Sequence, residues 1–169
     1  MPLGLPQHRV EIHPYDPNWP LLFAQEAQRL QTSLGDWALD IQHIGSTSVP
    51  GMPSKPIIDI AIAVQDFEQA FDTVPLMAEL GYNFRGEVGV KRRHFFMLGR
   101  PRTHHIHMLE QNSQAWKYRV GFRDFLVANP ESAREYMELK QRLAAEFPRD
   151  IASYSNGKES FIDSILARI

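Results

Sequence analysis

The segment from Pro56 to Val64, PIIDIAIAV, constrains the fold of this chain more than any other. It is a nearly continuous run of β-branched and other apolar residues, which is typical of a strand covered on both faces. We therefore expect an α/β (α+β) fold, and the order strand, helix, strand that begins with this segment implies a crossover in a mixed β-sheet. The one polar residue of the run is Asp59. A carboxylate inside an apolar strand must be ionised and paired, bound to a metal or protonated, so the segment also predicts a site at Asp59.

The other expected elements follow from apolar periodicity and from the placement of proline and glycine. Apolar positions at helical spacing predict an amphipathic helix over 19–34. A short strand ended by prolines is expected within 9–20, a strand over 37–44, a helix over 66–82, and a hairpin of strands at 92–99 and 103–110. The remainder is expected to be helical, in the segments 115–129, 130–147 and 148–169. These elements predict one domain, 1–169, with an α/β core over about 1–111 and a helical part over about 112–169.

Composition limits the classes of function. The 169 residues include no cysteine, which excludes disulfide and thiol chemistry and leaves His, Asp, Glu or backbone atoms for any metal site. A formal net charge of -2 argues against a nucleic acid partner, although a local basic cleft would still be compatible with it. The sequence has no leader-like segment and no apolar run long enough to span a membrane, so we expect a soluble, cytoplasmic protein. It gives no indication of the oligomeric state.

The loop before the buried strand has the residue types of a phosphate-binding turn. Gly45 would let a phosphate approach the backbone, and Ser46 and Thr47 could donate hydroxyl groups. Lys55 follows shortly before the strand, where an ammonium group could reach the same phosphate. The alternative interpretation is a plain turn capped by Ser or Thr, with Lys55 as an ordinary surface charge.

Histidines are concentrated in the second half of the predicted sheet. Period-2 alternation in THHIHM places His105 and His107 on one face of a strand and His104 on the other. Two imidazoles with this spacing can bind one metal ion, or one of them can act as a general base. The alternative is a pair of half-exposed, hydrogen-bonded histidines. His43 is a further candidate, or a residue that braces the loop.

Several basic residues could hold an anion. Tyr154 and Lys158 are one helical turn apart and therefore share a face, from which Lys158 could approach phosphates. The alternative is a solvated helix surface. Two arginine pairs could also act as anion clamps or as ordinary surface charge: Arg92 with Arg93, and Arg119 with Arg123.

Five segments, taken in their order, resemble the GrpB-like family: HIGSTSVPGMPSKPIIDI, RRHFF, THHIHM, FRDFLVANPESAREYMELK and YSNGKESFI. The resemblance runs from about Tyr15 to the C-terminus. It implies a nucleotidyltransferase-like core, namely a small mixed β-sheet flanked by helices, with a C-terminal helical extension. Relatives of this domain also occur fused to dephospho-CoA kinase, which implies an association with CoA or nucleotide metabolism.

The nucleotidyltransferase pattern contains a Gly-Ser pair, then two acids separated by one residue, then a third acid on a neighbouring strand. Three carboxylates hold two divalent cations that activate the attacking oxygen and stabilise the leaving pyrophosphate. Gly45 and Ser46 match the pair and Asp59 matches the first acid, but Ala61 stands at the second acid position. The third falls within the histidine segment, and Gln42 stands where the family commonly has Glu. These departures put two-magnesium transfer in doubt.

Two hypotheses of different classes follow. In the first, a nucleotidyltransferase-like enzyme transfers a nucleotidyl or phosphoryl group, with Asp59 and His107 as catalytic residues. Asp59, His105 and His107 would hold a divalent metal, for which Mn²⁺ or Zn²⁺ suits the ligands better than Mg²⁺. In the second, the chain is a non-catalytic module that binds a nucleotide or CoA-type ligand. A weaker third hypothesis is a metal site for simple hydrolysis. The predicted phosphate-binding residues are Gly45, Ser46, Thr47, Lys55, Arg93, Tyr154 and Lys158.

Overall fold

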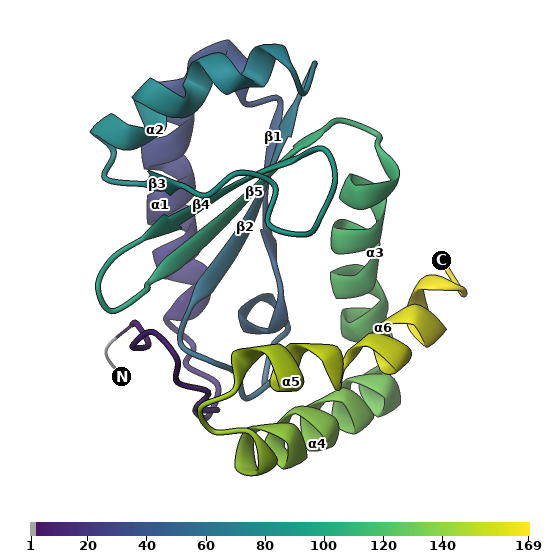
Figure 1. The fold of residues 1–169 in the computed structure, drawn as a ribbon. Helices are drawn as coiled ribbons and strands as arrows, with labels where there is room; N and C mark the ends of the chain where they lie inside the picture. Colours follow the sequence, from purple (N-terminus) through teal and green to yellow (C-terminus); the bar gives the residue numbers. More distant parts are fainter. Residues whose placement is uncertain (1–2) are drawn as a thin grey trace.

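A five-stranded mixed sheet lies at the centre of the computed structural model, which describes residues 3–169 (Figure 1). The strand order is β1-β2-β5-β4-β3; β2 and β5 are parallel, and the other pairs are antiparallel. The fold class predicted from the sequence is thereby confirmed. The strands are β1 Asp40–Ile44, β2 Ile58–Val64, β3 Asn83–Phe84, β4 Arg93–Leu98 and β5 His104–Glu110.

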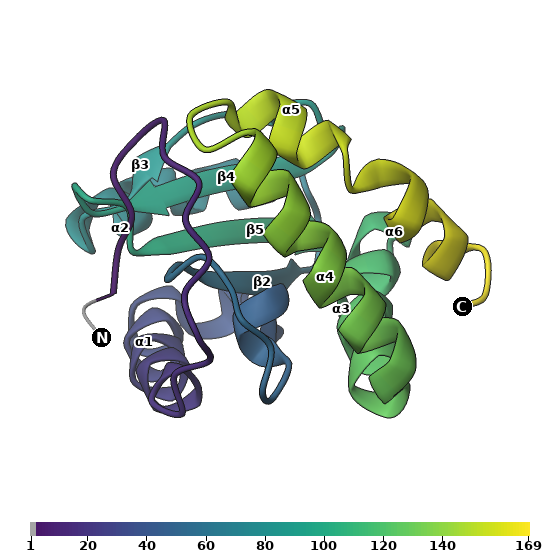
Figure 2. The same cartoon turned by 90° about the horizontal axis from the view of Figure 1, so that it is seen from below.

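Helices cover both faces of this sheet. One face packs against α1 and α2, and the other packs against α3, which also contacts α4 and α6. Figure 2 shows α3, α4 and α6 gathered at one side of the molecule and α1 at the other. The helices are α1 Trp19–Leu34, α2 Val74–Glu79, α3 Gln114–Ala128, α4 Pro130–Glu146, α5 Ile151–Asn156 and α6 Glu159–Leu166.

The alternation of side chains along β2 explains why the two faces differ. Ile58, Ile60 and Ile62 are fully buried in the larger core, against α1. The opposite face carries Asp59 followed by small alanines, which leave room for Trp116 of α3 to pack closely. The predicted strand is thus covered on both faces, but its Asp59 face is the one on which a polar site can form.

Three predicted elements differ from the structure. Residues 9–20 do not form a strand; His13 makes an isolated bridge with Ser54, and the segment runs beside α4. The helix expected over 66–82 consists of a 3₁₀ turn, Gln69–Thr73, followed by α2. Pro75 lies in the first turn of α2, where its ring prevents an α-helix from continuing through it. The short β3 was not predicted.

The third predicted element that differs is the helical segment 148–169, which is divided into α5 and α6. Gly157 lies at the junction. A Cβ atom there would lie 2.5 Å from Leu143 Cδ2, so glycine allows the junction to pack against Leu143 of α4 without displacing that side chain. The predicted helix over 19–34 has the bounds of α1, with Pro20 in its first turn. No helix among residues 3–169 combines the length and apolar composition that a membrane crossing requires.

Candidate functional site

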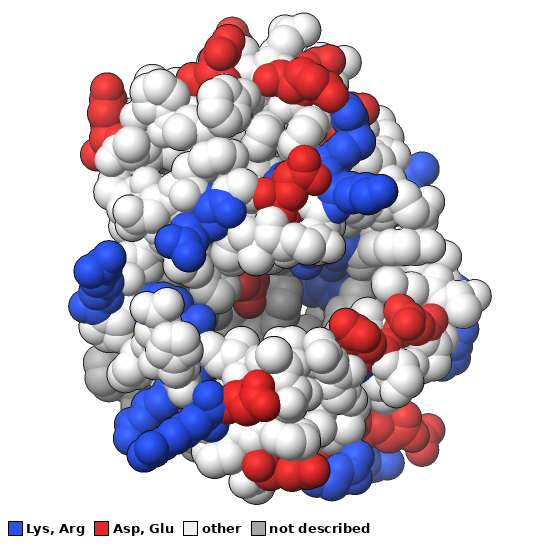
Figure 3. All heavy atoms as spheres, viewed as in Figure 1, with Lys and Arg blue, Asp and Glu red and all other residues white. Residues whose placement is uncertain are grey.

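A cavity of about 640 Å³ separates the Asp59 face of the sheet from the C-terminal helices. Figure 3 shows a hollow on this side of the molecule, with acidic and basic atoms inside it. Its walls come from the β1–β2 connection, from β2 and β5, and from α3 to α6, so they join segments that are far apart in sequence. The lining includes these predicted site residues: Gly45, Ser46, Lys55, Asp59, His105, His107, Tyr154 and Lys158.

The turn after β1 brings the backbone against the Asp59 carboxylate. Gly45 has φ 70° and ψ -175°, a conformation that is essentially restricted to glycine. A Cβ atom at this position would lie 2.7 Å from Asp59 Oδ2. Ser46 begins the 3₁₀ turn Ser46–Ser48, in which the Ser48 hydroxyl donates to the Gly45 carbonyl oxygen. Gly45 is therefore required both by its backbone conformation and by the carboxylate beside it.

Strand pairing gathers the acid and two histidines on one face of the sheet. Asp59 lies opposite His105, and Ala61 lies opposite His107. The Asp59 Oδ1 atom is 3.2 Å from His105 Nδ1 and 3.5 Å from His107 Nε2. Burial raises the pKa of Asp59, but hydrogen bonds from the two imidazoles outweigh burial and hold that pKa well below its ordinary value. The carboxylate is therefore ionised at neutral pH.

His107 is a neutral imidazole whose tautomer follows from its neighbours. Burial, reinforced by the Arg119 charge, lowers the pKa of His107 to about 3. Arg93 Nη1 lies 3.2 Å from His107 Nδ1 and can only donate, so this nitrogen is unprotonated and Nε2 carries the hydrogen toward Asp59. Arg93 was predicted to bind phosphate. The structure places it behind His107, outside the residues that line the cavity.

Thr47 also lies outside the cavity lining, and its hydroxyl contacts His43 instead. The Thr47 Oγ1 atom is 2.9 Å from His43 Nε2, and the imidazole stacks on Phe23 with ring centres 4.7 Å apart. Burial lowers the pKa of His43 to about 4. Arg123 donates to Gln42 Oε1 and to the His43 carbonyl oxygen at 3.1 and 2.7 Å, which ties α3 to β1. These residues brace the loop.

The Tyr154 ring lies close to two lysines in the wall of the cavity that contains Asp59. Its ring centre is 5.2 Å from Lys55 Nζ and 4.4 Å from Lys158 Nζ. Burial and the charge of Lys55 lower the pKa of Lys158 to about 8, and burial also lowers that of Lys55. The predicted proximity of Tyr154 and Lys158 is present, although α5 ends between them and Lys158 immediately precedes α6.

Sequence reasoning missed Lys140 and Tyr136, which line the same cavity from α4. Lys140 is only 2% exposed; its Nζ donates to the Pro53 carbonyl oxygen at 2.7 Å and lies 5.1 Å from the Tyr136 ring centre. Burial and the charges of two neighbouring lysines lower the pKa of Lys140 to about 7. The signal that was missed is a repeated spacing: Tyr136 precedes Lys140 by four residues, as Tyr154 precedes Lys158. Arg119 completes the basic lining.

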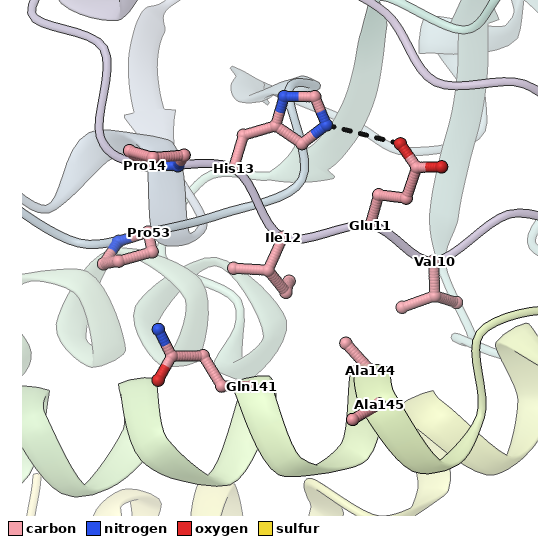
Figure 4. A pocket seen from close by; sticks show the side chains of 9 residues that line it. All are labelled: Val10, Glu11, Ile12, His13, Pro14, Pro53, Gln141, Ala144 and Ala145. Atoms are coloured by element: carbon pink, nitrogen blue, oxygen red, sulfur yellow. Dashed lines mark hydrogen bonds and ion pairs between the residues drawn. The ribbon is translucent and has the colours of Figure 1, made fainter.

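A second cavity, of about 550 Å³, lies between the N-terminal segment and α4 (Figure 4). Its polar side chains include Glu11 and His13, which contact each other at 3.4 Å, and Gln141. Much of the remaining wall is apolar and includes Val10 and Ile12. No lysine or arginine lines this cavity, so it lacks the convergence of charge found beside Asp59.

The predicted metal ligands do not form a ligand cluster as they lie. Within the described range 3–169, no group of three or more His, Asp or Glu side chains is arranged to hold a metal ion. The two imidazoles instead donate to the Asp59 carboxylate, which accepts from both. A divalent metal at this site therefore stays a prediction.

Comparison with known proteins places the chain among bacterial relatives. The family described as GrpB protein matches residues 9–168. The UPF0157 protein YqkA of Bacillus subtilis is 42% identical over 93% of this chain, which spans only 46% of that relative. The Glutamate-rich protein GrpB of Alkalihalophilus pseudofirmus is 35% identical over 97% of this chain and 98% of its own length.

The chain is also similar to a solved structure and, at lower sequence identity, to an enzyme. The crystal structure of conserved protein GrpB from Enterococcus faecalis is 36% identical, covers 94% of this chain and 96% of its own, and has a TM-score of 0.87. A dephospho-CoA kinase of Mycolicibacterium paratuberculosis is 26% identical over 89% of this chain and 43% of that protein. The family match over almost the whole chain and the full-length likeness to two GrpB proteins lead to one conclusion: this chain belongs to the GrpB family.

Proposed function

We propose that the cavity beside Asp59 binds a phosphate-containing small molecule, namely a nucleotide or a CoA-type ligand. The observation that carries this proposal is the charge of the lining. Three of the five lysines of the chain and Arg119 meet in one cavity, opposed by Asp59 and Glu159. With Lys140 protonated, four cations face two carboxylates and a neutral His107, which leaves an excess of two positive charges. A phosphate dianion would neutralise this excess.

The lysines of the cavity are buried and lie close enough to repel one another. Lys140 and Lys158 have lowered pKa values because they are buried and because the lysines repel one another. A bound phosphate would favour their charged forms and form charge-assisted hydrogen bonds with them. The Tyr154 ring holds Lys55 and Lys158 in place, so less side-chain freedom is lost when the anion binds.

The remainder of the cavity suits an organic group attached to the phosphate. Tyr118 and Phe122 are one helical turn apart on α3, and Ile162 and Leu166 face the same space from α6. An apolar and aromatic wall beside a cationic end is typical of sites for small organic phosphates. The dephospho-CoA kinase match fits a nucleotide or CoA-type ligand, and such a ligand accords with the cytoplasmic location predicted from the sequence.

Catalysis of nucleotidyl or phosphoryl transfer is the second candidate function. The observation in its favour is the ionised Asp59 carboxylate, held by two imidazoles at the floor of a cationic cavity. Against it, Ala61 lies beside Asp59 on the same face and opposite His107, where the superfamily pattern would have its second acid. The imidazole N–H groups that face Asp59 do not fit a metal ion as they lie, because a metal ligand must present a lone pair.

Calorimetric titration with ATP, CoA and pyrophosphate, each without added metal, tests the proposal. We expect saturable binding of at least one of them, weakened in Lys158→Gln and unchanged in Lys117→Gln. Lys117 is an exposed lysine on α3 outside the cavity lining, so it matches the loss of charge without touching the site. Absence of binding by all three ligands, or equal loss in both variants, would refute the proposal. Product analysis in the same samples separates transfer from simple binding.

A further inference from the structure

We propose that Arg93 keeps divalent cations out of the Asp59, His105 and His107 cluster by fixing which nitrogen of His107 carries the hydrogen. The inference goes beyond ligand binding, because it concerns the chemical nature of the Asp59, His105 and His107 cluster. It would be a hydrogen-bonded acid–imidazole cluster that operates without a metal. The inference does not depend on which phosphate-containing molecule occupies the cavity.

The argument begins with the two nitrogens of one imidazole. Arg93 Nη1 lies 3.2 Å from His107 Nδ1, and a guanidinium group has no acceptor, so His107 Nδ1 must present its lone pair to Arg93. The hydrogen of the neutral ring is then on Nε2, which faces Asp59 Oδ1 at 3.5 Å. A metal ion shared with Asp59 would need a lone pair on that same Nε2. His107 would then need its hydrogen on Nδ1, directly against the donors of Arg93.

Arg93 is held so that it cannot easily turn away. The residue is only 6% exposed. Its Nη2 donates to the carbonyl oxygens of Glu87 and Val88 at 2.9 and 2.8 Å, and its Nε donates to Glu87 at 3.2 Å. The guanidinium carbon is also 4.7 Å from the ring centre of Phe95. Moving it would break all of these contacts and leave buried donors unpaired, so the tautomer of His107 is fixed by the fold.

The positive charges around His107 oppose metal binding, as its tautomer does. The positive charges of Arg93 and Arg119 both act on His107, and a divalent cation at its Nε2 would experience the same repulsion. Asp59 is thus stabilised by the two imidazoles and by the surrounding lysine and arginine charges, without a metal ion. A phosphate group should therefore lie toward Lys55 and Lys158, and a hydroxyl or amino donor of the ligand should face Asp59.

Metal titration in the absence of any phosphate compound tests the proposal. We expect no stoichiometric binding of Zn²⁺ or Mn²⁺ to the cluster of the wild-type chain. In Arg93→Met, Zn²⁺ should bind about 10- to 100-fold more tightly, the range that outer contacts of a histidine ligand contribute. The gain should disappear in Arg93→Met combined with His107→Ala. Arg85→Met, which removes an exposed charge just beyond β3, is the matched control and should gain nothing.

A second measurement keeps the proposal testable if Arg93→Met does not fold. Long-range ¹H–¹⁵N correlation spectra of histidine-labelled wild-type protein, with His107→Ala for assignment, report which nitrogen of His107 is protonated. We expect hydrogen on Nε2 and a bare Nδ1. Hydrogen on Nδ1, wild-type metal binding that His107→Ala abolishes, or a folded Arg93→Met without gained affinity would each overturn the proposal. Because no phosphate ligand is present, these outcomes are independent of the proposed function.

Discussion

Replacing Gly45 with alanine tests whether the loop is shaped around the Asp59 carboxylate. The backbone conformation at Gly45 costs a residue with a Cβ atom about 1–3 kcal/mol. The added Cβ would also lie 2.7 Å from Asp59 Oδ2 and 3.1 Å from Asp59 Cβ, and overpacking of this kind costs about 1–3 kcal/mol. Together these effects predict a loss of about 2–6 kcal/mol in the free energy of unfolding. For a chain of this size, the loss corresponds to a fall of roughly 5–20 °C in melting temperature.

The matched control is Gly51→Ala. Gly51 also has a positive φ, 77°, but a Cβ atom there would meet nothing within 4 Å. This variant should lose only the backbone contribution, about 1–3 kcal/mol. Thermal and urea denaturation of both variants, with calorimetric titration of the bound ligand, separate the two effects. The reasoning is refuted if Gly45→Ala is no less stable than Gly51→Ala and binds the ligand as wild type does.

Four further predictions concern the cations and the bracing of the site. Between about pH 7 and 9, Lys140 and then Lys158 lose their protons, so calorimetry should show weaker ATP binding. Over the same range the ligand-free protein should become more stable in urea denaturation, since the unfolded chain binds more protons than the folded one. Lys158→Gln should weaken ligand binding about 10- to 150-fold, the value of one charge-assisted hydrogen bond, and Lys117→Gln should not. Tyr154→Phe should preserve affinity, whereas Tyr154→Leu should lower it about 2- to 30-fold in the same titration. Arg123→Met should cost about 1.5–3 kcal/mol in urea denaturation; an unchanged midpoint would contradict its bracing role.

The placement of Asp59, His105 and His107 could be predicted because it depends on the alternation of side chains along two strands. Period-2 alternation placed Asp59 on one face of β2 and paired His105 with His107 on one face of β5. The parallel register of these two strands then brings all three side chains together. Gly45 was predicted only as a point where a phosphate could approach the backbone; its close approach to the Asp59 carboxylate depends on how the loop folds back over β2.

The walls of the site could be predicted only in part, because Lys55, Tyr154 and Lys158 were among the predicted residues but Lys140 was not. A lysine in an amphipathic helix is ordinarily an exposed charge, and Lys140 is buried only because α4 packs across the loop that contains Pro53. Arg93 and Thr47 are polar residues in the expected segments, but strand pairing and loop packing turn them toward His107 and His43. Such contacts depend on tertiary packing, which sequence periodicity does not specify.

A crystal structure of the protein grown with saturating ATP and without metal tests the central claim most directly. The account predicts phosphate density in the cavity beside Asp59, within hydrogen-bonding distance of Lys55 and Lys158. It also predicts that Arg93 stays hydrogen-bonded to His107. If calorimetry shows that the protein binds ATP, an empty cavity beside Asp59, or ATP bound only in the second cavity between the N-terminal segment and α4, would contradict it.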